Sequence, residues 1–284
     1  MNWFRVVLFV MIVMSMLAPS CKKHEPAPGA FFLVADTVKV NAAEKQGSNS
    51  HKITDLWLYV NGQFQGAYPV GKKMPIVSHD KPVSINLFAG IQNNGISTTR
   101  VFWNFYELLQ IDTSIASGET VTMPITFRYN SSATFTWTEN FDSDLGYGIR
   151  KSDVSDTSFR LASAEDSFEN NSIEIGLSGN DQLAQIESSG PGFVLPYGKS
   201  DVYLELNYKC NHEFLVGLIS DDQRLRPTIF ISPQQQWNKI YIQLAQAVNS
   251  PQTSSRYKVF FRMVRGGSQG DLRMFLDNIK LVYL

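Results

Sequence analysis

The 284-residue sequence predicts an all-β protein built from two β-sandwich domains. After residue 30, successive segments alternate apolar and polar side chains with the period of two that is typical of a half-buried strand. Turn signals such as Asn61-Gly62 separate these segments at short intervals. Almost no segment has the apolar spacing of an amphipathic helix, and the chain length suits two domains of ordinary size.

The N-terminus predicts export from the cytoplasm. Residues 1–5 carry one positive charge, and residues 6–17 (VVLFVMIVMSML) are almost wholly apolar. The apolar run is too short to span a bilayer comfortably, because a transmembrane helix needs about 20 apolar residues. A charged start, a short apolar core and a small-residue exit are typical of a secretory signal peptide, which we expect over residues 1–20.

The exit of this segment, Leu17-Ala18-Pro19-Ser20-Cys21, resembles a lipobox. The leucine lies one position early and the proline is unusual, but the residues after Cys21 (KKHE) resemble those of Bacteroidota-type envelope lipoproteins, whose lipoboxes are looser. The resemblance implies a diacylated Cys21, a lipidated tether over residues 21–30, and an outer-membrane lipoprotein on the cell surface or the periplasmic face. The membrane would be contacted through the lipid anchor only. The alternative is an ordinary cleaved signal with an incidental cysteine. With Cys21 lipidated, Cys210 has no disulfide partner, and we expect it to be a small buried or half-buried residue rather than a nucleophile.

Residues 31–129 are expected to form the first sandwich. Residues 53–60 (ITDLWLYV) are rich in branched and aromatic side chains and end at the Asn61-Gly62 turn, which predicts a hairpin. Further β-patterned segments follow over residues 83–88, 101–112 and 121–127. The run over residues 58–66 (LYVNGQFQG) resembles the opening of PEGA-like and other immunoglobulin-like accessory domains of bacterial envelopes. It implies an immunoglobulin-like β-sandwich.

After a polar junction at residues 129–133, residues 134–284 are expected to form the second sandwich. Its strands at residues 202–208, 239–244 and 257–263 alternate strictly, so each has one core face and one polar-aromatic face. The segments ENFD (139–142), KVFF (258–261) and LDNI (276–279), with Trp237 before Ile240-Tyr241-Ile242, resemble carbohydrate-binding modules and galactose-binding-like domains. The resemblance implies an antiparallel jelly-roll.

The same resemblance implies a structural Ca²⁺ ion, because such modules often clamp their first and last strands with calcium. The matching positions are Glu139, Asp142 and Asp277. Calcium prefers six or more oxygen ligands, so backbone carbonyls would have to complete the site. The alternative is that Asp277 and Asn278 cap a turn and that the acids are solvated.

Composition and motifs argue against nucleic-acid binding and against catalysis. With 25 basic and 26 acidic residues the net charge is −1, so no strong field attracts nucleic acid. The sequence has no G-x-S-x-G, H-E-x-x-H, Walker-type or C-x-x-C motif, and no two of its four histidines have metal-ligand spacing. Glu174 and Glu205 each lack the neighbouring acid that a retaining glycosidase of the lectin-like jelly-roll type would show. We therefore expect a protein that is not an enzyme, with a glycan-active enzyme as the less favoured alternative.

Two binding functions compete. In the first, the polar-aromatic face of the second domain forms a shallow glycan platform, because aromatic rings stack on sugars while amides, carboxylates and arginine bind hydroxyls. Its candidate residues are Tyr203, Glu205, Asn207, Tyr241, Gln243 and Arg262. In the second, the protein is an adhesion or assembly subunit of an envelope complex, and an aromatic cluster of the first domain contacts a protein partner. That cluster is Phe102, Trp103, Phe105 and Tyr106. Ordinary packing, including contact between the two domains, is the third interpretation of both clusters. The glycan function is favoured by the resemblance alone.

Overall fold

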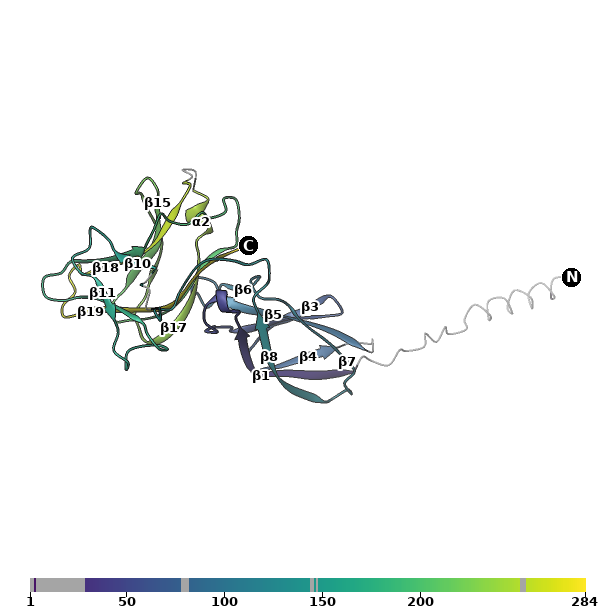
Figure 1. The fold of residues 1–284 in the computed structure, drawn as a ribbon. Helices are drawn as coiled ribbons and strands as arrows, with labels where there is room; N and C mark the ends of the chain where they lie inside the picture. The colour runs from purple at the N-terminus through teal and green to yellow at the C-terminus, as the bar shows by residue number, and fades with distance from the viewer. Residues whose placement is uncertain (1–2, 4–28, 78–81, 144–145, 147, 251–253) are drawn as a thin grey trace.

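The computed structural model describes residues 3, 29–77, 82–143, 146, 148–250 and 254–284, which form two β-sandwiches (Figure 1). The predicted all-β class is confirmed. Besides strands, the named elements are a 3-10 turn, η1 (Glu44–Gln46), and a one-turn helix, α2 (Ala245–Val248). Within the described ranges, no helix is long and apolar enough to cross a membrane. Cys21 and, apart from Trp3, the predicted signal peptide lie outside the described residues.

The N-terminal sandwich packs a three-stranded sheet against a larger one. The smaller sheet has the order β4-β1-β8, and β1 pairs parallel with β8. The larger sheet has the order β3-β2-β5-β6, and β7 also pairs with β5. The strands are β1 (Ala30–Asn41), β2 (Asp55–Val60), β3 (Gln63–Pro69), β4 (Lys73–Val77), β5 (Val83–Gln92), β6 (Arg100–Phe102), β7 (Leu109–Thr113) and β8 (Thr120–Arg128).

The hairpin of β2 and β3 follows directly from the local sequence. Asn61 and Gly62 both have positive φ, 48° and 78°, as the predicted turn requires. Along β2, Leu56 and Leu58 are buried in the core, whereas Trp57 lies on the opposite face of the sheet and is half-buried. The strand alternation therefore gives the larger sheet an inner aliphatic face and an outer face that carries aromatic side chains.

The C-terminal sandwich is antiparallel throughout its described strand pairs. One sheet has the order β10-β13-β18-β15-β16 and the other β11-β12-β19-β14-β17, with β9 pairing with β19. The strands are β9 (Thr134–Glu139), β10 (Ile149–Lys151), β11 (Phe159–Leu161), β12 (Ile173–Leu177), β13 (Leu183–Ser188), β14 (Val202–Cys210), β15 (Phe214–Ser220), β16 (Leu225–Ile231), β17 (Gln234–Gln243), β18 (Tyr257–Val264) and β19 (Leu272–Tyr283).

Strand β14 shows how this sandwich presents its side chains. Leu204 and Leu206 belong to the core of the C-terminal domain, while Tyr203 lies on the outer face and belongs to the core cluster of the N-terminal domain. Cys210 ends the strand inside the core, and burial raises the pKa of its thiol. The outer face of this sheet is therefore the surface on which the N-terminal domain rests.

Candidate functional site

Most of the predicted glycan platform lies buried between the two domains. Tyr203, Glu205, Asn207 and Tyr241 are only 5%, 0%, 3% and 1% exposed. Gln243 is half-buried, and its backbone N–H is also engaged by the N-terminal domain. The prediction of an open platform at these five residues is therefore wrong. They belong to the contact between the two domains. Such a contact is the third interpretation of these residues in the sequence analysis.

Aromatic side chains of the N-terminal domain fill this contact. The ring centroid of Trp103 lies 4.7 Å from that of Tyr203 and 4.8 Å from that of Tyr241. Phe105 lies 5.7 Å from Tyr203, and Tyr106 packs beside Trp103. Trp103, Phe105 and Tyr106 are all buried, so their predicted contact with a separate protein partner is wrong. Their partner is the other domain of the same chain.

Arg262 lies away from the other predicted platform residues. It belongs to β18, in the sheet opposite the one that holds β14 and β17. Its Nε donates a hydrogen bond of 2.6 Å to Oε1 of Gln185 on the neighbouring strand β13. The alternation correctly gave the face of each strand, but it could not say to which of the two sheets a strand belongs.

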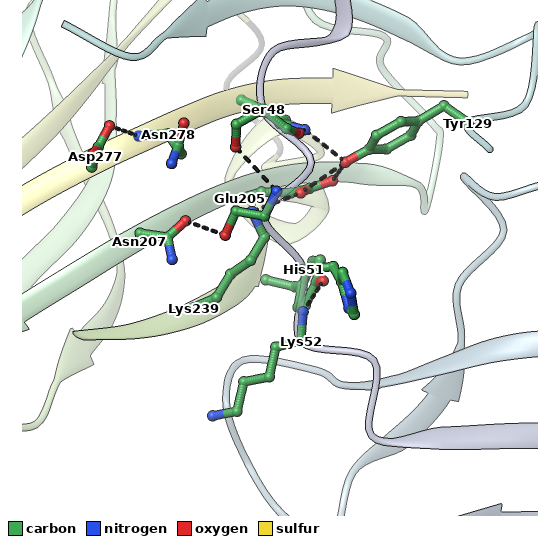
Figure 2. A network of polar contacts seen from close by, with 12 residues as sticks. Ser48, His51, Lys52, Tyr129, Glu205, Asn207, Lys239, Asp277 and Asn278 are labelled. Atoms are coloured by element: carbon green, nitrogen blue, oxygen red, sulfur yellow. Dashed lines mark hydrogen bonds and ion pairs between the residues drawn. The ribbon is translucent and has the colours of Figure 1, made fainter. Parts of the chain in front are cut away.

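A buried polar network crosses the domain contact (Figure 2). The Tyr129 hydroxyl donates to the Glu205 carboxylate, with oxygen distances of 3.0 and 3.1 Å, and the Lys239 ammonium lies 3.2 Å from the same carboxylate. Lys280 donates to the Tyr129 hydroxyl at 3.1 Å and to the Ser48 carbonyl at 2.6 Å. Burial lowers the pKa of Lys280 to about 7, although the nearby Glu205 carboxylate opposes this shift. The network joins charged groups of the C-terminal domain to polar groups of the N-terminal one.

Further hydrogen bonds fix the register of the two domains. Ser50 donates to Oδ1 of Asn207 at 2.8 Å, and the Lys52 backbone N–H donates to the Tyr241 hydroxyl at 2.9 Å. The Asn94 backbone N–H donates to the Tyr241 carbonyl, also at 2.9 Å. Because buried polar groups need such partners, these bonds account for polar residue types that the sequence had assigned to ligand binding.

A group of five aromatic rings that is partly exposed to solvent lies instead on the outer face of the larger N-terminal sheet. We call it the outer aromatic patch, and it consists of Trp57, Tyr59, Phe64, Phe88 and Phe102. Their ring contacts form a closed circuit, with successive centroids 5.2–5.7 Å apart. Phe64 and Phe102 are 51% and 40% exposed, and the other three are half-buried. Phe102 is the one member of the predicted protein-contact cluster that faces solvent.

The patch is held in place by its surroundings on the sheet. A Cβ added at Gly90 would lie 2.8 Å from Nε1 of Trp57, so the indole packs directly over this glycine. At the same edge the Arg100 guanidinium lies 2.8 Å from the buried Asp55 carboxylate. Nε1 of Trp57 and Oδ1 of Asn86 are buried without a hydrogen-bond partner in the described part of the chain. Both polar atoms lie on the strands that carry the patch and are closed off from solvent.

The sequence contains a signal for this patch in β2. Trp57 and Tyr59 alternate with Leu56, Leu58 and Val60 in a strand that was correctly predicted. Two large aromatic residues on the polar face of a sandwich strand are unusual, because that face normally carries hydrophilic side chains.

The three candidate calcium ligands are each satisfied by protein donors. Glu139 accepts the backbone N–H groups of Phe141 and Gly148, and Asp142 accepts the backbone N–H of Asn171. Asp277 accepts hydrogen bonds from the Ser172 hydroxyl and the Asn278 backbone N–H. Burial raises the pKa of Asp277 to about 7, against the effect of these hydrogen bonds. Among the described residues no three acidic, histidine or cysteine side chains are grouped so that they could hold a metal ion.

Chelation tests the calcium prediction. We expect EDTA to leave the melting temperature of the purified protein unchanged, because Glu139, Asp142 and Asp277 already bond to protein donors. Differential scanning calorimetry with EDTA and with excess Ca²⁺ is the measurement. A drop of several degrees in EDTA, restored by Ca²⁺ but not by Mg²⁺, would support the calcium site.

The two acids considered for glycoside hydrolysis are both engaged in ion pairs. Glu174 lies 2.9 Å from Nη2 of Arg160 and 3.5 Å from Nε of Arg273. Glu205 is buried in the domain contact with Lys239. Glu205 is therefore closed off from solvent, and Glu174, although it lines a pocket, does so together with Arg160 and Arg273, the two arginines that pair with it.

The sequence matches no protein-family model and no curated protein. Among solved structures, the fold is similar to the family 11 carbohydrate-binding module of a cellulosomal cellulase of Clostridium thermocellum, at 14% identity over 54% of this chain and 97% of that chain, with a TM-score of 0.37. It is also similar to a family 29 module solved with cellulohexaose, at 16% identity over 54% and 92% of the two chains, with a TM-score of 0.36. A family 29 module solved with mannohexaose matches at 15% identity over 53% and 91%, with the same TM-score. This distant likeness concerns the β-sandwich fold and does not identify a ligand.

Proposed function

We propose that the protein is a non-catalytic glycan-binding protein that uses the outer aromatic patch. The observation that carries this proposal is the closed circuit of five rings on a solvent-facing sheet. Aromatic faces stack on the apolar faces of sugar rings, and ligand hydroxyls need polar partners at the edge of such a platform.

The edge of the patch supplies such partners. Arg100 is half-exposed on its side chain while it pairs with Asp55, so its guanidinium has further N–H donors to offer. Nε1 of Trp57 and Oδ1 of Asn86 lack hydrogen-bond partners in the described part of the chain, and they become a donor and an acceptor for the ligand if its binding uncovers them. The patch therefore combines an apolar surface with donors and acceptors, which is the combination that a sugar requires.

A protein partner is the second candidate for the same surface. Phe64 and Phe102 are the most exposed rings of the patch and carry no polar atom. Exposed aromatic groups of this kind are enriched at the cores of protein interfaces. This candidate corresponds to an adhesion or assembly subunit of an envelope complex.

We also propose that the protein is a secreted envelope lipoprotein anchored to the outer membrane through Cys21. The support is the order of a charged start, a short apolar run and a small residue before a cysteine. Mass spectrometry of the mature N-terminus tests it, because an unmodified N-terminus at another residue would exclude the lipid anchor.

Replacing both exposed rings of the patch should abolish most of the glycan affinity. We expect the double variant Phe64→Ala, Phe102→Ala to bind the best ligand of a glycan array about 10- to 100-fold more weakly, since each stacked ring contributes about 0.5–1.5 kcal/mol. Because both rings are at least 40% exposed, the variant should stay folded, with a melting temperature lowered only by the ring contacts that it loses. Isothermal titration calorimetry with the full mature chain gives the affinities.

The matched control is Tyr197→Ala, which removes another exposed ring, 62% exposed, from the C-terminal domain. It should bind like the wild type. Glycan binding that survives the double variant would exclude the patch as the glycan site. The protein-binding function would be favoured by a different pair of results. The wild type would bind a purified envelope protein but no glycan, and the double variant would no longer bind that envelope protein.

A further inference from the structure

A groove of about 530 Å³ lies where the two domains meet, and residues of both domains line it. The N-terminal domain contributes Lys52 and the loop that carries Ile96. The C-terminal domain contributes Tyr208, Phe230 and Asn238, from β14, β16 and β17. Ligand sites form preferentially in clefts between domains, where polar and apolar side chains from different elements converge.

Polar groups from both domains are linked along one side of the groove. The Lys52 ammonium donates a hydrogen bond of 2.6 Å to Oδ1 of Asn238. Nδ2 of Asn238 in turn donates to the Tyr208 hydroxyl at 2.9 Å. Figure 2 shows the Lys52 side chain directed away from the buried Glu205 network. The relay therefore holds the ammonium at the groove.

The charge of the groove is not balanced by the protein. Lys52 is the one charged residue among those that line it, and it forms no ion pair with the described part of the chain. An ammonium has three donors, and the hydrogen bond to Asn238 uses one of them. Partial burial lowers the pKa of Lys52, as expected for a cation without an anionic partner. An anionic group in the groove would supply that partner.

The groove also has an apolar wall. Phe230 is 64% exposed and Ile96 is 50% exposed, and both line it. An exposed phenyl ring in the same groove as a hydrogen-bonding relay suits a ligand with one apolar face and several hydroxyls. A free inorganic anion would leave this wall uncovered.

We propose that the interdomain groove is a second binding site, specific for an acidic sugar whose carboxylate pairs with Lys52. The sugar ring lies on Phe230, and its hydroxyls bond to Asn238 and Tyr208. This site is distinct from the outer aromatic patch and does not depend on it. Because both domains line the groove, the bound sugar also holds them together, and it stabilises the folded chain by mass action.

The test uses hexamers of three acidic sugars, namely galacturonate, mannuronate and the glucuronate-containing hyaluronan, each beside its methyl-esterified form. The ester keeps the sugar and removes the charge. We expect the wild-type mature chain to bind one of the acids about 10- to 100-fold more tightly than its ester, because a hydrogen bond between charged groups is worth more than a neutral one. Lys52→Met should remove this preference. Phe230→Ala should weaken acid and ester alike.

Two variants serve as controls. Lys72→Met removes an exposed lysine elsewhere on the N-terminal domain and should keep the preference for the acid. The patch variant Phe64→Ala, Phe102→Ala should keep it too, so failure of the patch and failure of the groove give different results. The proposal is overturned if the wild type binds none of the three acids, if ester and acid bind equally, or if Lys52→Met retains the preference. If the patch variant loses acid binding while Lys52→Met and Phe230→Ala keep it, the acidic sugar binds at the outer aromatic patch and not in the groove.

Discussion

Replacing Glu205 by alanine is expected to lower the free energy of unfolding by about 3–5 kcal/mol, the usual cost of removing one partner of a buried ion pair. The Glu205 carboxylate is fully buried, and the side chain of Lys239, 3.2 Å away, is only 2% exposed. Without the carboxylate, the Tyr129 hydroxyl loses its hydrogen-bond acceptor and the buried Lys239 ammonium loses its ion-pair partner. Urea denaturation followed by circular dichroism measures the loss.

Two further variants separate the ion pair from a general effect of losing a carboxylate. Glu213→Ala removes an exposed acid of the same domain and should change the free energy of unfolding by less than about 0.5 kcal/mol. Replacing the pair together, by Glu205→Leu with Lys239→Met, leaves neither of these charges buried and should recover much of the loss. If Glu205→Ala is as stable as Glu213→Ala, the network of Figure 2 is not a structural element.

The decrease in the free energy of unfolding caused by Glu205→Ala should also depend on pH in a defined direction. The folded-state pKa of Lys280 is about 7, below its unfolded value of about 10.4, so its contribution to stability is present above pH 10 and is lost as the pH falls toward 7. The Glu205 carboxylate favours the charged form of Lys280 and so limits this loss. The difference between wild type and Glu205→Ala should therefore be larger at pH 7 than at pH 10.

The faces of the strands could be predicted from the sequence because the alternation is a local property. Leu204 and Leu206 point into the core, and Tyr203 and Glu205 point outward, as their spacing requires. Which part of the chain covers the outer face of a strand is not a local property, because it depends on residues far away in the sequence. The N-terminal domain covers Tyr203, whereas the corresponding outer face of β2 leaves Trp57 near solvent. Both faces show aromatic residues among polar ones, so the sequence pattern alone cannot tell an internal contact from a binding surface.

Arg262 and Lys52 show two further limits of sequence interpretation. Arg262 has the right alternation for the predicted platform, but the order of strands places β18 in the opposite sheet. Lys52 precedes a strand and belongs to no motif, and only the docking of the domains brings it to Asn238, 186 positions later in the chain. Sites made by docking depend on contacts between distant positions, which strand patterns do not contain.

Truncating Trp103 to alanine is expected to cost about 3–5 kcal/mol and to weaken the coupling between the two domains. The Trp103 ring is 2% exposed and lies within 5 Å, between centroids, of Phe105, Tyr203 and Tyr241. Alanine would leave a cavity at the centre of the aromatic contact between the two domains. Differential scanning calorimetry should then show two separated transitions in place of one cooperative transition.

The variant Trp103→Phe distinguishes ring packing from hydrogen bonding. Nε1 of Trp103 has no hydrogen-bond partner in the described part of the chain, so phenylalanine loses no hydrogen bond and keeps most of the ring contacts. It should cost less than about 1.5 kcal/mol and keep a single transition. Equal destabilisation by phenylalanine and alanine would show that a smaller aromatic ring cannot replace the packing of the full indole. A single transition in Trp103→Ala at unchanged temperature would mean that the polar network alone holds the domains together, because the aromatic contact would then contribute nothing measurable to their docking.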